Sequence, residues 1–565
     1  MKPISRSGFL NILTGTGPVN VIAQNTFLPD NPGGATGKHA TTGLTPYTGP
    51  MGQDQLLHLI RRTLFGVSCA DYNFFSGKTL NECLDILLTQ SKSPDPPVNT
   101  YNTADLKDPD VPPGKTWVFA PFGDNEYKLN GVRFLNLKAW WVGQMITQNR
   151  SLTEKMMVFW SNYMAAQMYM MKDSRLSYSY FAAIRAHVMG NFKSLVREIT
   201  TNPGMLEYLN GNDNTAIAPN ENYSRELQEL FTVGKEPGAH YTETDVKEAA
   251  RVLTGWDTTD TWDNGKPGGV GFAFNAEKHD KGDKKFSAFY GNKVIAGKEG
   301  EQGTLETDEL IDMIFTKREV AKYFCRNVYR WFVCANITKA IETNIIEPLA
   351  DVFIENKFEI KPVLKTLLGS AHFFEAVNMG CQIKSPIDHL IGACRQLNYT
   401  GAISDVDKQY ADWGQLATRL QKERGGMDPG DPPNVAGWPA YYQSPAYAEI
   451  WINATTLAER NSTTDFLVNY RFDVLGFAKQ LPDPTEPNRL IADSCKLLSA
   501  VPFSKDQIAV MKDILLPGHF KDLYWTEIWD GYITNPADEP KRSIIVNRLA
   551  NLYSHILQRS EYQLN

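Results

Sequence analysis

Apolar residues recur at helical spacing along most of this chain, and residues 219–256 show the pattern most clearly. Four apolar residues fall on one side of a helix when successive residues are placed about 100° apart, namely Tyr223, Leu227, Leu230 and Phe231. After a turn marked by Gly234 and Gly238, a second run has the same spacing. Its members are Val246, Ala249, Ala250 and Leu253. The segment therefore predicts two helices, each with one buried face.

The same spacing predicts the organisation of the rest of the chain. Helical patterns extend from about residue 53 to 255, with a proline-rich interruption at 93–127, and resume at 306–423. Residues 257–305 lack the pattern and are dense in Gly, Asp, Lys and aromatic residues, which predicts a long loop with short strands. A second irregular loop is expected at 425–445, and an amphipathic helix near 543–557.

We therefore predict a mainly α fold, a single large multi-helix domain with long irregular loops and a helical C-terminal extension. Residues 1–52, which are rich in Gly, Pro and Thr from 26 onward, are expected to form an extended arm. The helical core domain is expected at 53–470 and the C-terminal helical extension at 471–565. A strand content above about a quarter of the residues would contradict this fold class.

Two carboxylates lie at the margins of the predicted helices in residues 219–256. Glu226 lies at the edge of its apolar stripe, and Asp245 follows Thr242 at the spacing of a variant capping box. A carboxylate at the edge of burial can have a raised pKa, which suits general acid or base catalysis. Glu226 and Asp245 are therefore candidate catalytic residues. Beside other oxygens they could also bind a hard cation, so a divalent cation is a candidate cofactor without an assigned ligand set.

Three neighbouring polar residues, Asn220, Asn222 and Arg225, are candidate ligand-binding residues. The short amide side chains can cap the free N–H groups at the start of a helix. Because a short turn joins the two helices, we predict that these residues, Glu226 and Asp245 form one hydrogen-bonded cluster.

Other interpretations of this segment stay open. Glu221 and Arg225 are spaced for an ion pair on an exposed helix face, where such pairs are common and individually weak. The alternating asparagines that begin at Asn210 and end at Asn214 have the spacing of the first ligands of a calcium loop. The glycine that such a loop needs at its sixth position is missing, which favours an Asn-rich turn folded against the next segment.

The adjacent pair His279 and Asp280 lies in the long loop at 257–305. An imidazole beside a carboxylate can serve as base, acid or metal ligand, so both residues are candidate catalytic residues. The alternative is a turn in which Asp280 binds a backbone amide.

Aromatic residues gather in and after the second irregular loop. Trp438 and Tyr441 are candidate ligand-binding residues, because exposed aromatic faces suit sugar rings or extended peptides. If these rings are buried, they instead fill the end of a helical bundle.

Composition and missing motifs narrow the classes of function. A net charge of −7 argues against a nucleic-acid surface, which is normally basic. No apolar run approaches the roughly 18 to 20 residues of a membrane span. The seven cysteines include no CxxC pair, and Cys325 and Cys334 are predicted to be buried thiols. The chain also lacks HExxH, GxSxG, P-loop and complete GxGxxG motifs, which disfavours the corresponding enzyme classes.

Several segments of the chain resemble a large bacterial family known as domain of unknown function 1800. They include HLIRRTLFG at 58–66, LTEKMMVFW at 152–160, PNENYSRELQELFTVG at 219–234, YTETDVKEAARVLTGW at 241–256, KSP at 384–386 and PPNVAGWP at 432–439. The resemblance covers about residues 55–461. The family commonly has His-x-His after Phe-Trp, where this chain has Ser161 and Tyr163. Any metal site that those histidines form in relatives is lost or altered here.

The resemblance implies an extracytoplasmic protein, located in the periplasm, on the surface or secreted, with a cytoplasmic location as the alternative. Residues 5–10, SRSGFL, are similar to a twin-arginine export box that lacks one arginine. Relatives are often encoded beside a sulfatase-like protein, which makes such a protein an expected partner.

Two classes of function stay open, and whether the chain is an enzyme is undecided. A hydrolase or lyase of the cell envelope that acts on a glycan would use Glu226, Asp245 or the pair His279 and Asp280 as acid and base. A non-catalytic scaffold or binding protein would use the same polar groups to hold helix and loop together. The Ser161 and Tyr163 departure favours the second class.

Overall fold

The structure is a computed structural model that describes residues 43–121, 126–260, 270–401, 405–421, 424–518 and 521–565. The predicted export box and most of the predicted N-terminal arm lie outside the described residues.

The fold is mainly α, as the apolar spacing predicts, and 57% of it is helical. The described strands form two small antiparallel sheets. Strand β1 (Trp256–Asp260) pairs with β2 (Val270–Phe274), and β3 (Lys284–Lys285) pairs with β4 (Val294–Ile295). All four strands lie in or at the edge of the loop for which short strands are predicted.

The first half of the chain carries the helices on which Asn222, Arg225, Glu226 and Asp245 lie. They are α2 (Gln53–Thr63), α3 (Cys69–Phe75), α4 (Leu80–Leu87), α5 (Glu126–Ile146), α6 (Thr153–Tyr163), α7 (Ser174–Ala186), α8 (Phe192–Thr200), α9 (Pro203–Tyr208), α10 (Asn222–Glu226) and α11 (Glu243–Val252).

The second half continues with further helices. They are α12 (Thr304–Ile314), α13 (Arg318–Phe332), α14 (Lys339–Ile341), α15 (Glu347–Glu355), α16 (Ile360–Leu368), α17 (Pro386–Gln396), α18 (Val406–Leu420), α19 (Ala454–Tyr470), α20 (Val474–Lys479), α21 (Pro487–Leu498), α22 (Lys505–Leu515), α23 (Asp522–Thr534) and α24 (Glu539–Leu557).

Short helical turns connect these elements. The π turns are η4 (Leu227–Thr232) and η7 (Glu342–Ile346). The 3-10 turns are η2 (Met168–Met171), η3 (Gly211–Asp213), η5 (Ala288–Tyr290), η6 (Gly300–Gly303), η8 (Ala376–Asn378), η9 (Pro439–Tyr441) and η10 (Tyr447–Trp451).

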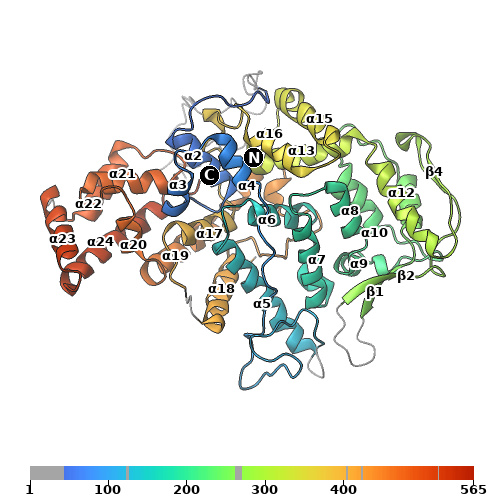
Figure 1. The fold of residues 1–565 in the computed structure, drawn as a ribbon, viewed down its shortest axis with the longest axis horizontal. Coiled ribbons are helices and arrows are strands. Elements are labelled where there is room, and N and C mark those ends of the chain that lie inside the picture. The colour runs from blue at the N-terminus through green and yellow to red at the C-terminus, as the bar shows by residue number, and fades with distance from the viewer. Residues whose placement is uncertain (1–42, 122–125, 261–269, 402–404, 422–423, 519–520) are drawn as a thin grey trace.

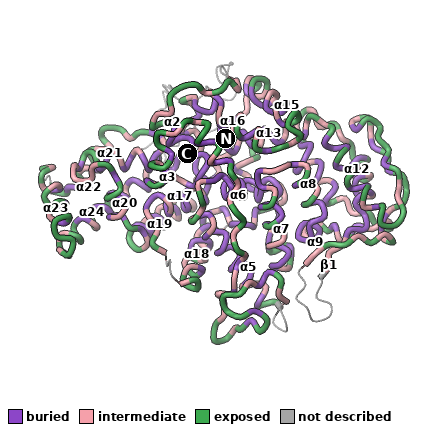
Figure 2. Tube along the Cα trace, viewed as in Figure 1, coloured by how far each residue is buried: buried purple, intermediate pink, exposed green. Residues whose placement is uncertain are grey.

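The helices form an elongated arrangement (Figure 1). Helices α20 to α24 lie at one end of the molecule, and α9 to α12 with the strands lie at the other. Buried residues concentrate along the middle of the molecule (Figure 2). The buried apolar side chains form one cluster that extends from Leu56 to Leu564. The last residues return to the centre beside α2, where Leu564 forms a backbone bridge with Ile383.

The local signals at residues 219–256 produce the predicted helices. Thr242 Oγ1 accepts a hydrogen bond from the Asp245 amide at 3.3 Å, and Asp245 Oδ2 accepts one from the Thr242 amide at 2.7 Å, which completes the predicted capping box. The predicted buried faces of both helices are buried, apart from a half-exposed Leu230. Helix α10 continues into η4, and Gly234 ends it with a φ of 86°, a backbone conformation that favours glycine.

Candidate functional site

Asp245 is fully buried, and its carboxylate holds a helix and a loop together. Its carboxylate accepts four hydrogen bonds, from the amide and hydroxyl of Thr242 and from the amide and hydroxyl of Ser287. These bonds use both oxygens of the carboxylate, which is otherwise enclosed by protein. Asp245 therefore starts α11 and fixes the loop between β3 and β4.

The predicted single cluster around Asp245 does not form, because the hydrogen bonds of its members fall into separate sets. Asn220 and Asn222 belong to the Asn-rich turn. The amide of Asn220 donates to Asn214 Oδ1 at 2.8 Å, and Asn222 Nδ2 donates to Asn210 Oδ1 at 3.3 Å. These bonds match the prediction of a turn folded against the next segment.

Arg225 makes a second, separate set of contacts. Its guanidinium forms ion pairs with Glu221 at 2.9 Å and Glu243 at 2.8 Å, both of them at least a third exposed. The exposed helix-face ion pair proposed as an alternative for Glu221 and Arg225 is therefore present.

Glu226 differs from the other candidates, because its carboxylate is not used by the fold. Its Oε2 atom is buried and has no hydrogen-bond partner among the described residues. Burial raises the pKa of Glu226, and the nearby positive charges of Lys235 and Arg225 only partly oppose this effect. Its charge in turn helps to raise the pKa of two neighbouring phenols, Tyr208 and Tyr241.

His279 lies in a buried polar group that the sequence did not reveal. Its Nδ1 lies 2.9 Å from the carbonyl oxygen of Thr254, and its Nε2 lies 3.1 Å from Glu306 Oε1. Lys284 Nζ donates to the other oxygen of Glu306 at 2.6 Å, and neither side chain is exposed. Burial alone would raise the pKa of Glu306, but the hydrogen bonds from His279 and Lys284 outweigh it and keep that pKa below its usual value.

Asp280 forms the predicted turn. Its carboxylate accepts hydrogen bonds from Arg251 at 2.8 and 3.0 Å and from the amide of Gly282 at 2.8 Å. Burial opposes ionisation of Asp280, but the bonds from Arg251 and Gly282 lower its pKa. The His279 and Asp280 segment thus anchors the long loop to α11.

Trp438 fills the core, as the bundle-filling alternative predicts. It is only 2% exposed, and its amide donates to Asn162 Oδ1 at 2.8 Å. Tyr441 is half-buried, with its ring centroid 4.5 Å from that of Trp331 and 5.8 Å from that of Trp451.

Ser161 and Tyr163, which stand where the family commonly has histidines, are both buried. Ser161 Oγ donates to the carbonyl oxygen of Val158 at 2.9 Å. The hydroxyl of Tyr163 donates to the carbonyl oxygen of Phe231 at 3.3 Å. Burial raises the pKa of Tyr163 well above its usual value. In this chain Tyr163 therefore connects α6 to η4, whereas the Ser161 hydroxyl bonds within α6.

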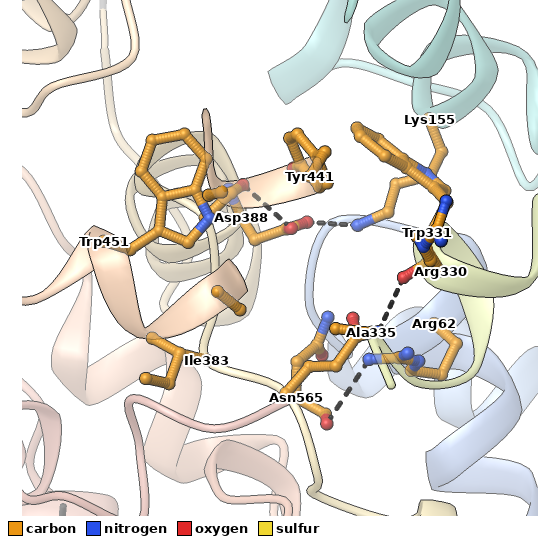
Figure 3. Close-up of a pocket in the computed structure, with 14 residues that line it drawn as sticks. Arg62, Lys155, Arg330, Trp331, Ala335, Ile383, Asp388, Tyr441, Trp451 and Asn565 are labelled. Atoms are coloured by element: carbon orange, nitrogen blue, oxygen red, sulfur yellow. Dashed lines mark hydrogen bonds and ion pairs between the residues drawn. The ribbon is translucent and has the colours of Figure 1, made fainter. Parts of the chain in front are cut away.

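Several of the segments that resemble the family meet at a small cavity (Figure 3). Arg62 comes from HLIRRTLFG, Lys155 from LTEKMMVFW and Ser385 from KSP, and Tyr441 follows PPNVAGWP. The cavity has a volume of about 20 Å³, which is room for a water-sized group. It is lined by Arg62, Lys155, Arg330, Trp331, Ala335, Gln382, Ile383, Ser385, Asp388, Ala440, Tyr441, Ala448, Trp451 and Asn565.

Positive charge exceeds negative charge among the side chains that line this cavity. Lys155 forms an ion pair with Asp388, whose other oxygen accepts a hydrogen bond from Ser385 Oγ at 2.9 Å. Arg62 is 1% exposed and donates to the carbonyl oxygens of Phe332 and Val333, each at 2.8 Å. Burial lowers the pKa of both Arg62 and Lys155.

Two arginines of the cavity wall lack a carboxylate, and two donors lack an acceptor. Within the described part of the chain, neither Arg62 nor Arg330 forms an ion pair. Arg330 Nε and Trp331 Nε1 are buried, and neither has a hydrogen-bond partner among the described residues. A buried donor without an acceptor costs about 1 to 3 kcal/mol, so such donors mark a place for a water molecule or a ligand.

Sequence reasoning missed this cavity. The residues that build it come from segments far apart in the chain, and no local spacing relates them. Their presence in separate family-like segments was the one available signal.

Two further findings concern the described residues only. They contain no helix that is long and apolar enough to cross a membrane. They also contain no group of three or more His, Cys, Asp or Glu side chains placed to hold a metal ion.

Comparison with known families agrees with the motif resemblance. The family model described as "Protein of unknown function (DUF1800)" matches residues 58–564. The chain belongs to this family. The DUF1800 match continues well past the last family-like segment recognised in the sequence, so it includes the predicted C-terminal extension as well as the predicted core. Searches of curated proteins and of solved structures found no match.

Proposed function

We propose that this chain is a non-catalytic binding protein of the bacterial cell envelope that holds an acidic group of its ligand at the cavity between Arg62, Lys155 and Arg330. The observation that carries the proposal is the unbalanced positive charge of this cavity. Three cationic side chains line it together with one carboxylate side chain, that of Asp388.

Charge and hydrogen bonding together favour an anionic ligand. A buried cation is costly unless an opposite charge or acceptors compensate it. Among the described residues, Arg62 donates only to main-chain oxygens, those of Phe332, Val333 and Asn565, and Arg330 Nε has no acceptor. An oxygen of a carboxylate, sulfate or phosphate group would accept from Arg330 and Trp331 and would balance the charge.

The size of the cavity limits what can enter it. A volume of about 20 Å³ holds one water-sized group, so one oxygen of the acidic group would enter and the rest of the ligand would stay outside. An acidic group that projects from a protein partner or from an envelope polysaccharide would enter in this way. The envelope location and a sulfatase-like partner are proposed on the family resemblance.

Most of the predicted acid–base groups are already used in structural hydrogen bonds, which also supports a non-catalytic protein. Asp245 and His279 are fully enclosed, and Asp280 is bound to Arg251 and Gly282. A general acid or base must reach the substrate directly or through a water molecule. Three of the four candidates therefore hold the loop in place.

Thermal unfolding with small anions tests the proposal. At constant ionic strength, sulfate, phosphate or acetate should raise the melting temperature of the wild type above its value in chloride, since a ligand that binds only the folded state stabilises it. Sulfate and phosphate also stabilise folded proteins in general, so Arg330→Gln should lose the specific part of the rise. Arg318→Gln, which alters an arginine paired with Asp351 outside the cavity, should retain it. An equal melting temperature in all four anions would contradict the proposal.

The partner is tested separately. When the chain is co-expressed with the sulfatase-like protein of its own locus, the two should elute together in size-exclusion chromatography, and Arg330→Gln should weaken the complex. Anion binding without co-elution would support the cavity and reject this partner.

A second candidate function, a glycan-acting hydrolase or lyase, is favoured by one observation. Glu226 keeps a buried, unpartnered oxygen and a raised pKa, which are properties of a general acid. Turnover of any member of a panel of envelope polysaccharides by the wild type, lost in Glu226→Gln and retained in Glu229→Gln, would establish this function in place of the first.

A further inference from the structure

Two cysteines from distant parts of the chain meet beside the cavity. Cys334 follows α13, and Cys381 precedes the KSP segment. Cys381 Sγ lies 3.2 Å from the carbonyl oxygen of Val333, which belongs to the peptide bond that leads into Cys334. Since that oxygen lies about 3 Å from the Cα atom of the next residue, Cys381 Sγ is at most about 6 Å from the Cα atom of Cys334. The two thiols also share a hydrogen bond, so their sulfur atoms are already in contact.

The two thiols are also the most accessible cysteines of the chain. Cys334 and Cys381 are partly exposed, whereas the other cysteines are buried. Those buried cysteines are Cys69, Cys83, Cys325, Cys394 and Cys495. All seven are free thiols in the structure. Cys325 is therefore buried as predicted, but Cys334 is not fully buried, because it lies past the end of α13.

The surroundings of Cys334 favour its thiolate. The thiol of Cys381 forms a hydrogen bond to the Cys334 sulfur, and this bond is the largest cause that lowers the pKa of Cys334 to about 6. Burial opposes the shift, while a backbone hydrogen bond at Asn336 and the charges of Arg62 and His372 add to it. Tyr329 also faces the pair. By contrast, burial raises the pKa of Cys69 to about 11.

We propose that Cys334 and Cys381 are a redox pair that closes reversibly to an intramolecular disulfide. Reactive thiol pairs combine an accessible thiolate with a second cysteine within reach, and this pair combines both features.

Formation of the disulfide requires a two-electron oxidant, and hydrogen peroxide is one. The Cys334 thiolate attacks one peroxide oxygen, which forms an S–O bond and breaks the O–O bond, and the leaving hydroxide takes up a proton to become water. Cys381 then attacks the Cys334 sulfur, which forms the S–S bond and breaks the S–O bond. The proton of Cys381 leaves with the second hydroxide as water. Two thiols lose two electrons in total, and one peroxide gains them.

The disulfide would join the end of α13 to the segment that leads into α17. Ala335 and Gln382, which directly follow the two cysteines, both line the cavity. Gln382 Nε2 already donates to the carbonyl oxygen of Arg330 at 2.7 Å. Oxidation would therefore fix one wall of the cavity covalently. The redox pair itself does not depend on what the cavity binds.

Peptide mapping of the full chain tests the proposal. The reduced protein is treated with an equimolar amount of hydrogen peroxide, blocked with iodoacetamide and digested without reduction. Mass spectrometry should find the Cys334 and Cys381 peptides linked, and dithiothreitol should separate them. Seven free thiols after treatment, or a link between other cysteines, would overturn the proposal.

Variants separate the two chemical steps. In Cys381→Ser the resolving thiol is missing, so Cys334 should accumulate as the sulfenic acid and react with dimedone. Cys325→Ser, which removes a buried thiol, should form the same disulfide as the wild type. In the reduced wild type at pH 7, Cys334 should react with iodoacetamide at least tenfold faster than Cys325. Equal rates would contradict the proposal even if a variant failed to fold.

Discussion

Asp245 accepts hydrogen bonds from both the amide and the hydroxyl of Ser287, each at 2.7 Å, although 42 residues separate the two in sequence. The same carboxylate closes the capping box with Thr242. One buried side chain therefore begins α11 and also fixes the loop that the helix packs against. This relationship explains why a residue with the features of a catalytic carboxylate has a structural role.

Asp245→Asn should destabilise the protein by about 1 to 3 kcal/mol, because the amide that replaces one oxygen faces donors and leaves them unsatisfied. Chemical denaturation monitored by circular dichroism measures the change. Glu243→Gln in the same helical turn is the matched control, and it should have little effect because Glu243 is largely exposed. If Asp245→Asn were as stable as the wild type, the hydrogen bonds of the Asp245 carboxylate would contribute nothing to the free energy of unfolding.

Glu306→Gln should be more damaging. It leaves Lys284, which has no exposed side-chain area, without its carboxylate, and loss of one partner of a buried ion pair typically costs about 3 to 5 kcal/mol. Glu309→Gln on the same helix is the control. Its pair with Lys298 is partly exposed, so the change should cost no more than about 1 kcal/mol.

The contribution of Glu306 to the stability of the protein changes with pH in a defined direction. Its pKa in the folded chain lies below the usual 4.5. The stabilisation is therefore fully present above pH 4.5 and is lost as the pH falls from there toward the lowered pKa. The stability difference between wild type and Glu306→Gln should shrink on acidification, and a constant difference from pH 7 down to about pH 3 would reject the ion pair as its cause.

Contacts within a few residues were predictable from the sequence, whereas contacts across the chain were not. Thr242 and Asp245 are three residues apart, so the geometry of one helical turn brings them together. The apolar stripe with Tyr223 follows from the helical repeat in the same way. The partner of Asp245 in the loop could not be found, because an irregular loop has no repeat that relates Ser287 to a helix.

The same limit applies to the buried charges and to the cavity. In the sequence, nothing distinguishes Glu306 from other acidic residues near a helix start. Only the folded loop brings His279 and Lys284 to it. Arg62 and Ser385 lie on one cavity because the tertiary fold brings α2 to the start of α17. The sequence predicts the buried faces of the helices, but tertiary packing decides which polar side chains share a space.

Trp438 gives a test of the aromatic residues after the second loop. Trp438→Ala should destabilise the protein by about 3 to 5 kcal/mol, because removal of a buried aromatic ring leaves a cavity. Tyr442→Ala, at a residue that is 43% exposed, should change the stability by no more than about 0.5 kcal/mol. A large loss of glycan binding by a stable Trp438→Ala protein would restore the ligand-binding interpretation.

Glu226→Gln should leave the protein as stable as the wild type or slightly more stable at pH 7. The carboxylate oxygen Oε2 has no partner among the described residues, and burial raises the pKa of the group above 4.5. Well below pH 4.5 the carboxyl is protonated in both the folded and the unfolded chain, and the variant has no advantage. Above pH 4.5 the unfolded chain releases its proton first, so the wild type loses stability while the neutral amide does not. Melting temperatures from about pH 4 to 8 should therefore diverge with rising pH, to a gain of about 1 to 2 °C for the variant. A variant that melts several degrees lower at pH 7 would instead show that the Glu226 carboxylate stabilises the folded chain, and would count against its use as a general acid.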